Sequence, residues 1–193
     1  MSSEQENQQW RKAQRVRLLA QRLAMPRDVH RAAGAAITKI LVDTLLPEIA
    51  PRTLAAYWPI RGEYDTRPVL SAMYKTGMNL ALPAVEFKSA PLAFRAWKPG
   101  ALMEEGPMDI PQPARAVYVN PDCLLIALVG FDAHNHRLGY GAGLYDHTLA
   151  AMNPKPVSIG VGFAFQRLDD IRPQPHDMPL DYIVTEEGVQ RGR

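Results

Sequence analysis

The stretch Gly130–Leu149, GFDAHNHRLGYGAGLYDHTL, decides the fold of this 193-residue chain. It follows an uninterrupted apolar run, Cys123–Val129, which predicts a strand buried on both faces. Gly139, Gly141 and Gly143 then allow backbone N–H groups to approach an anion closely, because no Cβ stands in the way. The next residues have helical character, and the first turn of a helix directs further N–H groups at the same place. Strand, glycine loop and helix in this order favour a phosphate-binding site.

Two charged residues next to the glycines decide how this loop is interpreted. A G-x-G-x-G pattern alone is equally compatible with a tight turn between two core elements. Arg137 before the loop and Asp146 after it favour a nucleotide and metal site. A second acid, Asp177, lies far along the chain. Since Mg²⁺ takes one or two protein carboxylates together with phosphate oxygens and water, two acids near a phosphate loop predict ATP with magnesium. Each acid taken alone is better explained as a helix cap or a salt-bridge partner.

Patterning along the rest of the chain predicts an α/β protein with a three-layer arrangement. We expect four helices, over residues 8–25, 28–46, 67–75 and 143–152. The first should bury an apolar stripe of Val16, Leu19 and Leu23. The second should end before Pro47, and Thr66 should cap the third. We expect strands over residues 53–58, 79–82, 92–97, 123–129, 157–165 and 182–185. The buried face of the second helix should carry Ile37, Ile40, Leu41, Thr44 and Leu45.

Arg11 and Arg15 lie four positions apart on the first expected helix and therefore point the same way. Like charges at this spacing repel by about 0.2–0.5 kcal/mol, so the pair favours an anion between them. The alternative is a solvated basic face, which the nearby Arg17 and Arg22 favour on the sequence alone.

Composition narrows the class of protein. A chain of 193 residues fits one domain, residues 1–193. A formal net charge of +2 is too small to favour nucleic acid or an anionic membrane as partner. The single cysteine, Cys123, agrees with a reducing compartment. Without a signal-like start or an apolar run of about 20 residues, we expect a cytoplasmic protein that acts on a small molecule, without nucleic acid or membrane.

Phe131-Asp132 and the run Arg137–Asp146, RLGYGAGLYD, resemble the signature of the 5-formyltetrahydrofolate cyclo-ligase (5,10-methenyltetrahydrofolate synthetase) family. The likeness runs from the first helix to Thr185. It implies a three-layer α/β/α Rossmann-like sheet of the NagB/RpiA/CoA transferase-like kind. It also implies that the chain uses ATP and Mg²⁺ to convert 5-formyltetrahydrofolate to 5,10-methenyltetrahydrofolate, with ADP and phosphate as the other products, as a monomer. In that reaction ATP phosphorylates the formyl oxygen, N10 attacks the activated carbon, and phosphate leaves.

The resemblance also assigns roles to particular residues. Catalysis would fall to Arg137 and Tyr145. ATP would be bound by Arg11, Arg15, Arg137, Leu138, Gly139, Tyr140, Gly141, Ala142, Gly143, Leu144 and Tyr145. The folate would contact Trp58, Glu63, Tyr140 and Leu144, and Mg²⁺ would be held by Asp146 and Asp177. The residues alone leave Trp58 open as core filling and Glu63 open as an exposed loop acid.

The chain departs from the family pattern at Leu128, Ala142, Leu144 and His147. We interpret it as an active, divergent enzyme, because the charges that the chemistry needs are retained. One alternative is a folate- or nucleotide-binding paralogue without turnover. Another is a different reaction on the same sheet, such as sugar-phosphate isomerisation, which would leave the adenine and magnesium residues unexplained.

Overall fold

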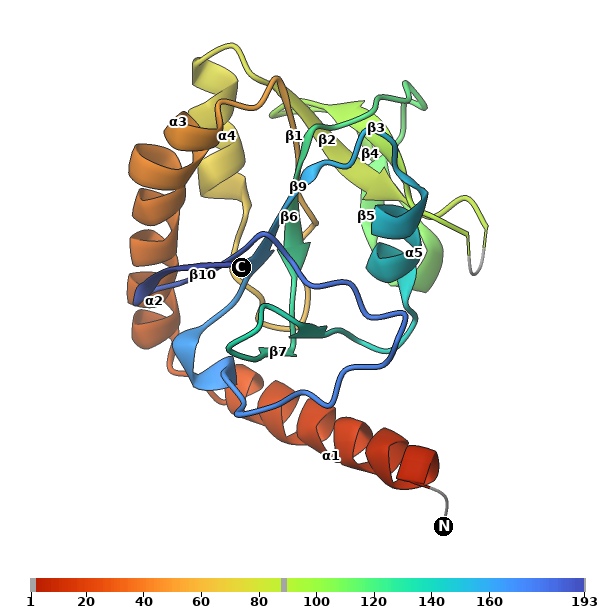
Figure 1. Ribbon diagram of the computed structural model, residues 1–193. Coiled ribbons are helices and arrows are strands. Elements are labelled where there is room, and N and C mark those ends of the chain that lie inside the picture. The colour runs from red at the N-terminus through yellow and green to blue at the C-terminus, as the bar shows by residue number, and fades with distance from the viewer. Residues whose placement is uncertain (1–2, 88–89, 193) are drawn as a thin grey trace.

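The computed structural model describes residues 3–87 and 90–192. Its centre is a seven-stranded sheet with strand order β11-β10-β9-β6-β1-β2-β3 (Figure 1). Its strands are β1 (Thr53–Ala55), β2 (Asn79–Ala84), β3 (Ala93–Trp97), β6 (Cys123–Ala127), β9 (Val157–Val161), β10 (Tyr182–Thr185) and β11 (Gly188–Arg191). The five inner strands are parallel, and the edge strands β3 and β11 are antiparallel to their neighbours. The predicted α/β class is confirmed, and β6, buried along nearly its whole length, lies in the middle.

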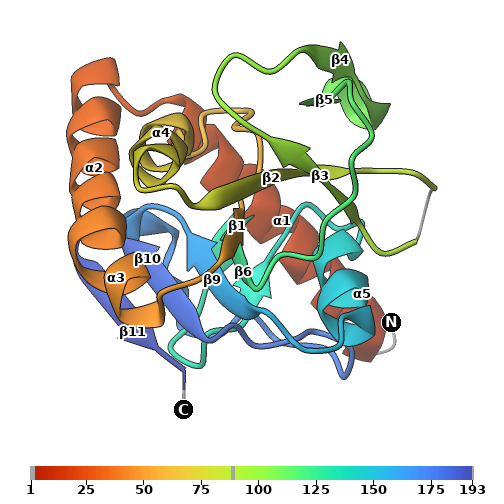
Figure 2. The ribbon, with the colours of Figure 1, turned by 90° about the horizontal axis from the view of Figure 1, so that it is seen from above.

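Helices cover both faces of this sheet (Figures 1 and 2). One face carries α2 (Arg27–Ile40), α3 (Leu46–Ile49) and α4 (Arg67–Lys75), and the other carries α5 (Leu144–Ala151). Each face has its own apolar core: Ile37 and Leu70 pack in the first, and Leu149 packs with Phe131 in the second. The long helix α1 (Ser3–Leu23) crosses below the sheet, next to β7 (Gly130–Phe131), at the carboxyl ends of the parallel strands (Figure 1).

The predicted apolar stripe of α1 is wrong. Val16 and Leu23 are each 64% exposed, whereas Arg11, Leu18 and Arg22 are buried. The reason is the place of the helix in the fold. It lies across strand ends and loops, where carbonyl and carboxylate oxygens need donors, so Arg11, Arg15 and Arg22, which share one helical face, point inward.

The second predicted helix does not end before Pro47. α2 continues through a π-helical turn, Leu41–Leu45, into α3, whose first turn contains Pro47. Proline lacks an N–H and its ring crowds the preceding turn, and the wider π turn accommodates both effects. Ile37, Leu41 and Leu45 form the buried face as predicted, but Thr44 is exposed, which corrects that part of the expectation.

Several boundaries also differ from the sequence-based expectation. β1 and β6 are shorter than the predicted strands, and β9 ends at Val161, after which a 3₁₀ turn, Ala164–Gln166, begins. Thr66 does not cap α4 with its side chain: its hydroxyl donates to the carbonyl of Tyr57 at 2.8 Å. Two short hairpins were not predicted from the sequence, β4–β5 (Met103–Glu105 and Pro111–Pro113) and β7–β8 (the latter Arg137–Leu138). Within the described residues, no helix has the length and apolar character needed to span a bilayer.

Candidate active site

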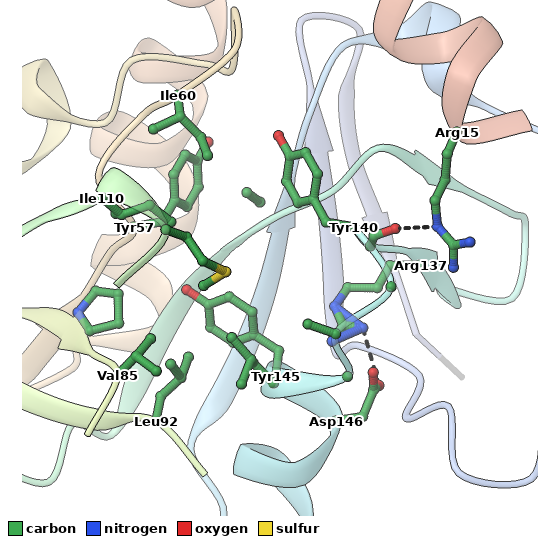
Figure 3. Close-up of a pocket in the computed structure, with 18 of the residues that line it drawn as sticks. Arg15, Tyr57, Ile60, Val85, Leu92, Ile110, Arg137, Tyr140, Tyr145 and Asp146 are labelled. Atoms are coloured by element: carbon green, nitrogen blue, oxygen red, sulfur yellow. Dashed lines mark hydrogen bonds and ion pairs between the residues drawn. The ribbon is translucent and has the colours of Figure 1, made fainter. Parts of the chain in front are cut away.

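A cavity of about 850 Å³ opens at the carboxyl ends of the parallel strands (Figure 3). Its walls are the glycine loop, the inner face of α1, the segments that follow β1 and β2, and the β4–β5 hairpin. It brings together every residue that the sequence assigned to the site except Leu138. Leu138 is fully buried in β8, and its carbonyl accepts the N–H of Val129 at 2.8 Å. Its contribution is to fix the start of the glycine loop.

The cavity has two chemically different sides (Figure 3). Tyr57, Val85, Leu92, Ile110 and Tyr145 make one side apolar and aromatic. Arg15, Arg137 and Asp146 lie on the other, and Tyr140 stands between the two groups. One wall therefore suits a flat ring, and the opposite wall suits an anion.

Arg11 on the charged side is held by Asp177. Its guanidinium forms a fork: Nη1 donates to Oδ2, and Nη2 donates to Oδ1 at 3.3 Å. Nη1 also donates to the carbonyl of Arg172. Burial alone would raise the pKa of Asp177, but the hydrogen bond and charge of Arg11, with the N–H of Gln174, hold that pKa below its ordinary value of 3.8.

Arg15 shares this face and lies against the glycine loop. Its Nε donates to the carbonyl of Gly139 at 2.8 Å, which leaves the outer guanidinium nitrogens toward the cavity. Burial lowers the pKa of Arg15, and the neighbouring charge of Arg11 adds to this effect. An arginine that is partly desolvated beside a second cation gains from a bound anion, because the anion relieves both penalties.

Arg137 and Asp146 form a second buried ion pair. Nη1 of Arg137 donates to Oδ1 of Asp146 at 3.1 Å, and the N–H of Met178 donates to the same oxygen at 3.2 Å. The guanidinium carbon of Arg137 lies 5.8 Å from the ring centre of Tyr145. Burial lowers the pKa of Arg137, while the charges of Asp146 and Asp177 oppose that shift. The two ion pairs are thus electrostatic neighbours.

The glycine loop has the backbone that its sequence predicts. Gly141 and Gly143 have φ angles of +105° and +65°, which side-chain-bearing residues rarely adopt. Gly143 precedes the first turn of α5, which begins at Leu144. A Cβ on Gly141 would lie 3.6 Å from the guanidinium carbon of Arg15, so the loop and that arginine are in close contact. The combination gives a concave, donor-rich wall.

Glu63 lies at the border of the two sides and is buried, not exposed. Its Oε1 accepts the hydroxyl of Tyr140 at 2.6 Å, and its Oε2 accepts the N–H of Ile60 at 2.9 Å. Burial raises the pKa of Glu63, although the hydrogen bond from Tyr140 and the charges of Arg22 and Arg61 oppose the shift. A carboxylate in this setting still has lone pairs for the N–H groups of a ligand ring.

Trp58 combines the two interpretations that the sequence left open. It lines the cavity and also packs against the apolar core on the α2 face. Its ring meets that of Trp97 edge to face at 6.5 Å between centroids, and the guanidinium of Arg67 lies 5.8 Å from it. The indole is therefore held in a fixed orientation at the mouth of the aromatic side.

The donor chemistry of the two acids fits a magnesium ion with phosphate. Both line the cavity, and hard carboxylate oxygens are what Mg²⁺ prefers. Both interactions of Asp146 fall on Oδ1, whereas Asp177 uses both of its oxygens for Arg11. Within the described residues no cluster of three or more metal-ligating side chains exists, so phosphate and water would have to supply the remaining ligands.

Sequence reasoning missed several residues that line or support the site. Arg22 is the third arginine of the inner face, and its spacing of eleven positions from Arg11, three helical turns, was a usable signal. Lys12 lines the cavity beside Arg11. The hairpin loop at Met108 and Asp109 also lines it, with φ angles of +62° and +58°. Met108 gives no warning of such backbone, because positive φ is uncommon outside glycine, asparagine, aspartate and histidine.

Comparisons with known proteins agree with this geometry. A sequence profile described as the 5-formyltetrahydrofolate cyclo-ligase family matches residues 7–186. A Mycoplasma pneumoniae protein named 5-formyltetrahydrofolate cyclo-ligase is 29% identical over 91% of this chain and 98% of its own length. Its Escherichia coli K12 namesake is 28% identical over 87% and 95%. The Aquifex aeolicus 5,10-methenyltetrahydrofolate synthetase structure is 27% identical, with a TM-score of 0.82 over 95% of this chain and 93% of that one.

Proposed function

The chain belongs to the 5-formyltetrahydrofolate cyclo-ligase family, and from this premise we propose that it converts 5-formyltetrahydrofolate to 5,10-methenyltetrahydrofolate with ATP and Mg²⁺. One observation carries the proposal: a single cavity has a wall of aromatic and apolar side chains opposite a wall of arginines and backbone donors. A folate ring needs the first wall and a triphosphate needs the second, and the reaction requires both within one cavity. The formyl oxygen and the γ-phosphate would meet between them.

Arg11, Arg15 and the glycine loop are the proposed triphosphate site. Two guanidinium groups on one helix face, beside backbone with positive φ at Gly141 and Gly143, supply positive charge and N–H donors to phosphate oxygens. The partial desolvation of Arg15 supports this assignment, because a charge-assisted hydrogen bond is stronger where water is excluded.

Glu63 is the proposed anchor for the folate ring. Its free lone pairs face ring N–H donors, and Trp58, Leu144 and Tyr140 supply the flanking surfaces. Burial at the border between the two sides supports this role, since a desolvated carboxylate gains from ring N–H donors added to its hydrogen bonds from Tyr140 and Ile60. The ring would then present its N5 formyl group to the charged side.

Arg137 and Tyr145 are the proposed catalytic residues. The transferred phosphoryl group passes to the formyl oxygen, N10 then attacks the formyl carbon, and phosphate leaves as the bridge closes. This chemistry needs positioning and charge neutralisation more than a protein nucleophile. Arg137 supports the first step with a buried positive charge next to the glycine loop, and Tyr145 packs against that guanidinium and fixes its direction.

Asp146 and Asp177 are the proposed magnesium residues. The ion, when bound, neutralises phosphate charge. Asp146 has the better claim of the two, because its Oδ2 is not used by Arg137 or Met178. Asp177 would have to share its oxygens with Arg11.

A single assay tests the proposal. The purified protein, Mg-ATP and 5-formyltetrahydrofolate are mixed, and the methenyl product and ADP are measured together. We expect one ADP for each product, and no ATP consumption without folate. Binding of both ligands without product would identify a binding paralogue instead.

We further propose that the protein acts as a monomer in the cytoplasm, because one chain supplies every wall of the cavity and its Cys123 thiol is buried and unpaired. Sedimentation velocity tests the monomer.

A further inference from the structure

Arg22 is a buried cation that the reaction outlined above does not use. It is 2% exposed and lies on the inner face of α1. Its Nε donates to the carbonyl of Arg61 at 3.0 Å, its Nη1 donates to the carbonyl of Leu128 at 3.2 Å, and its Nη2 donates to the hydroxyl of Tyr140. The guanidinium is therefore fixed by three separate segments of the site, and it has no freedom to turn away.

The direction of the hydrogen bonds follows from this arrangement. A guanidinium only donates, so the Tyr140 oxygen accepts from Arg22 and its proton must go to Glu63. Oε1 of Glu63 thus accepts from Tyr140, and Oε2 accepts from Ile60. Nη2 of Arg22 is itself 4.0 Å from Oε1. A protonated Glu63 would point its own O–H at one of these donors. The hydrogen bonds therefore stabilise the ionised form of Glu63 over the protonated form.

The other groups around Glu63 do not replace Arg22. The charge of Glu63 adds to burial in raising the pKa of Tyr57 after β1 and of Tyr145 on α5, so both phenols stay neutral and neither supplies a positive charge to the carboxylate. Arg61 is exposed, and His30 on α2 hydrogen-bonds the backbone carbonyls of Gly62 and Glu63 rather than the Glu63 carboxylate. Arg22 is the buried cation of this set.

We propose that Arg22 is a positioning residue that acts through Tyr140 to keep Glu63 ionised and oriented as a hydrogen-bond acceptor for the folate ring. The assignment of the folate ring rests on the proposed function. The relay itself rests on the contacts of Arg22, Tyr140 and Glu63. In this proposal the last turn of α1, through Arg22, serves the side of the cavity that binds the folate ring. The earlier turns, through Arg11 and Arg15, serve the side that binds the phosphates.

The ligand-free titration of Glu63 tests the relay directly. Its carboxyl ¹³C signal is followed against pH in glutamate-labelled protein and assigned by its loss in Glu63→Gln. We expect the titration midpoint to rise by about one pH unit, a tenfold change in proton affinity, in both Arg22→Gln and Tyr140→Phe. The double variant should shift by less than the sum, because the two residues act in series. Arg17→Gln, an exposed arginine on the same helix, should leave the midpoint unchanged.

Tyr140→Phe keeps the test decisive if Arg22→Gln fails to fold, because Tyr140 is 38% exposed and its hydroxyl is not needed for packing. In that case Arg22→Lys, which keeps the charge but cannot reach three acceptors, replaces the glutamine variant and should also raise the midpoint. A Glu63 midpoint that stays at the parent value in Tyr140→Phe overturns the relay, and so does full additivity in the double variant.

Ligand binding then tests the role. Equilibrium binding of 5-formyltetrahydrofolate is measured across the pH range in which the Glu63 signal is seen to titrate. The acidic limb of the Arg22→Gln variant should move up by the same amount as its Glu63 midpoint, whereas the limb of Arg17→Gln should stay at the parent position. If the parent protein fails to bind this folate, the proposed function fails while the titration result still decides the relay. A shifted Glu63 midpoint with an unmoved binding limb overturns the positioning role.

Discussion

Arg11 and Asp177 lie 166 positions apart in the chain and form a forked ion pair at the edge of the cavity. Both side chains are less than a tenth exposed. The pair joins the first helix to the segment before β10, so the site closes only when both ends of the chain are in place.

The stability of the protein in acid should depend on Asp177. Its pKa is held below the ordinary 3.8, so ionised Asp177 stabilises the fold at pH values above 3.8. That contribution is lost as the pH falls from 3.8 through the lower folded value. Asp177→Asn should lower the free energy of unfolding at pH 7 by about 1–3 kcal/mol, because Arg11 loses its charged partner. The difference between variant and parent should shrink below about pH 4. Urea unfolding across pH 2.5–7 checks this, and a difference that is constant with pH would contradict it.

Asp146→Asn should act on the magnesium dependence of turnover. Asparagine keeps the shape and hydrogen-bonding reach of the side chain but removes the charge that a hard cation needs. Turnover should fall steeply and recover in part as magnesium is raised, with the fold intact. Asp28→Asn, at an exposed position in the first turn of α2, is the matched control and should leave the curve unchanged. A parent-like magnesium curve for Asp146→Asn would end the metal assignment.

Arg15→Gln should weaken ATP far more than folate. A charge-assisted hydrogen bond to phosphate is worth about 1.5–3 kcal/mol, so the Kd for ATP should rise about 10- to 150-fold. The folate Kd should change less than about twofold, since Arg15 lies on the charged side. Arg17→Gln on the exposed face controls for loss of charge on α1. Calorimetry with each ligand separates the outcomes, and equal losses for both would indicate a folding defect.

The glycines of the loop should not be equally tolerant of alanine. Gly141 has a φ of +105°, where a Cβ is strained even without a clash, so Gly141→Ala should cost about 1–2 kcal/mol. A Cβ on Gly139 would meet no atom within 4 Å, and Gly139 has no positive φ. Gly139→Ala should therefore stay within about 0.5 kcal/mol of the parent. Thermal unfolding compares the pair, and equal costs would show that conformation does not distinguish the two positions.

The parts of the fold that the sequence predicts well are those governed by local pattern. The apolar run at β6 predicts a strand buried on both faces, because no polar residue occurs in it. The glycines predict a close approach of backbone N–H groups, and the positive φ angles of Gly141 and Gly143 agree with this. Arg137 and Asp146, the charged residues that flank this loop, both line the cavity. These signals lie within residues 123–146.

The inner face of α1 could not be predicted in the same way. Helical periodicity selects the apolar stripe, but the groups opposite α1 are carbonyls and carboxylates from Arg61, Leu128, Gly139 and Asp177. These acceptors come from four distant segments, and only the folded chain brings them together. Thr66 shows the same limit, since the acceptor of its hydroxyl, the Tyr57 carbonyl, is set by the loop between β1 and α4.

The attachment of α1 has a consequence for how the molecule opens. Among the residues of α1 whose burial is described, Leu18 is the one fully buried apolar side chain, and Arg11 and Arg22 are buried beside it, so the hydrophobic effect holds this helix less than it holds the sheet. Such an element unfolds locally at a lower free energy than the core, and its amides should exchange with solvent before those of β6. Because both ligands would contact this same face, their binding and the docking of the helix reinforce each other by mass action. The amino-terminal helix is in that sense a part of the binding equilibrium.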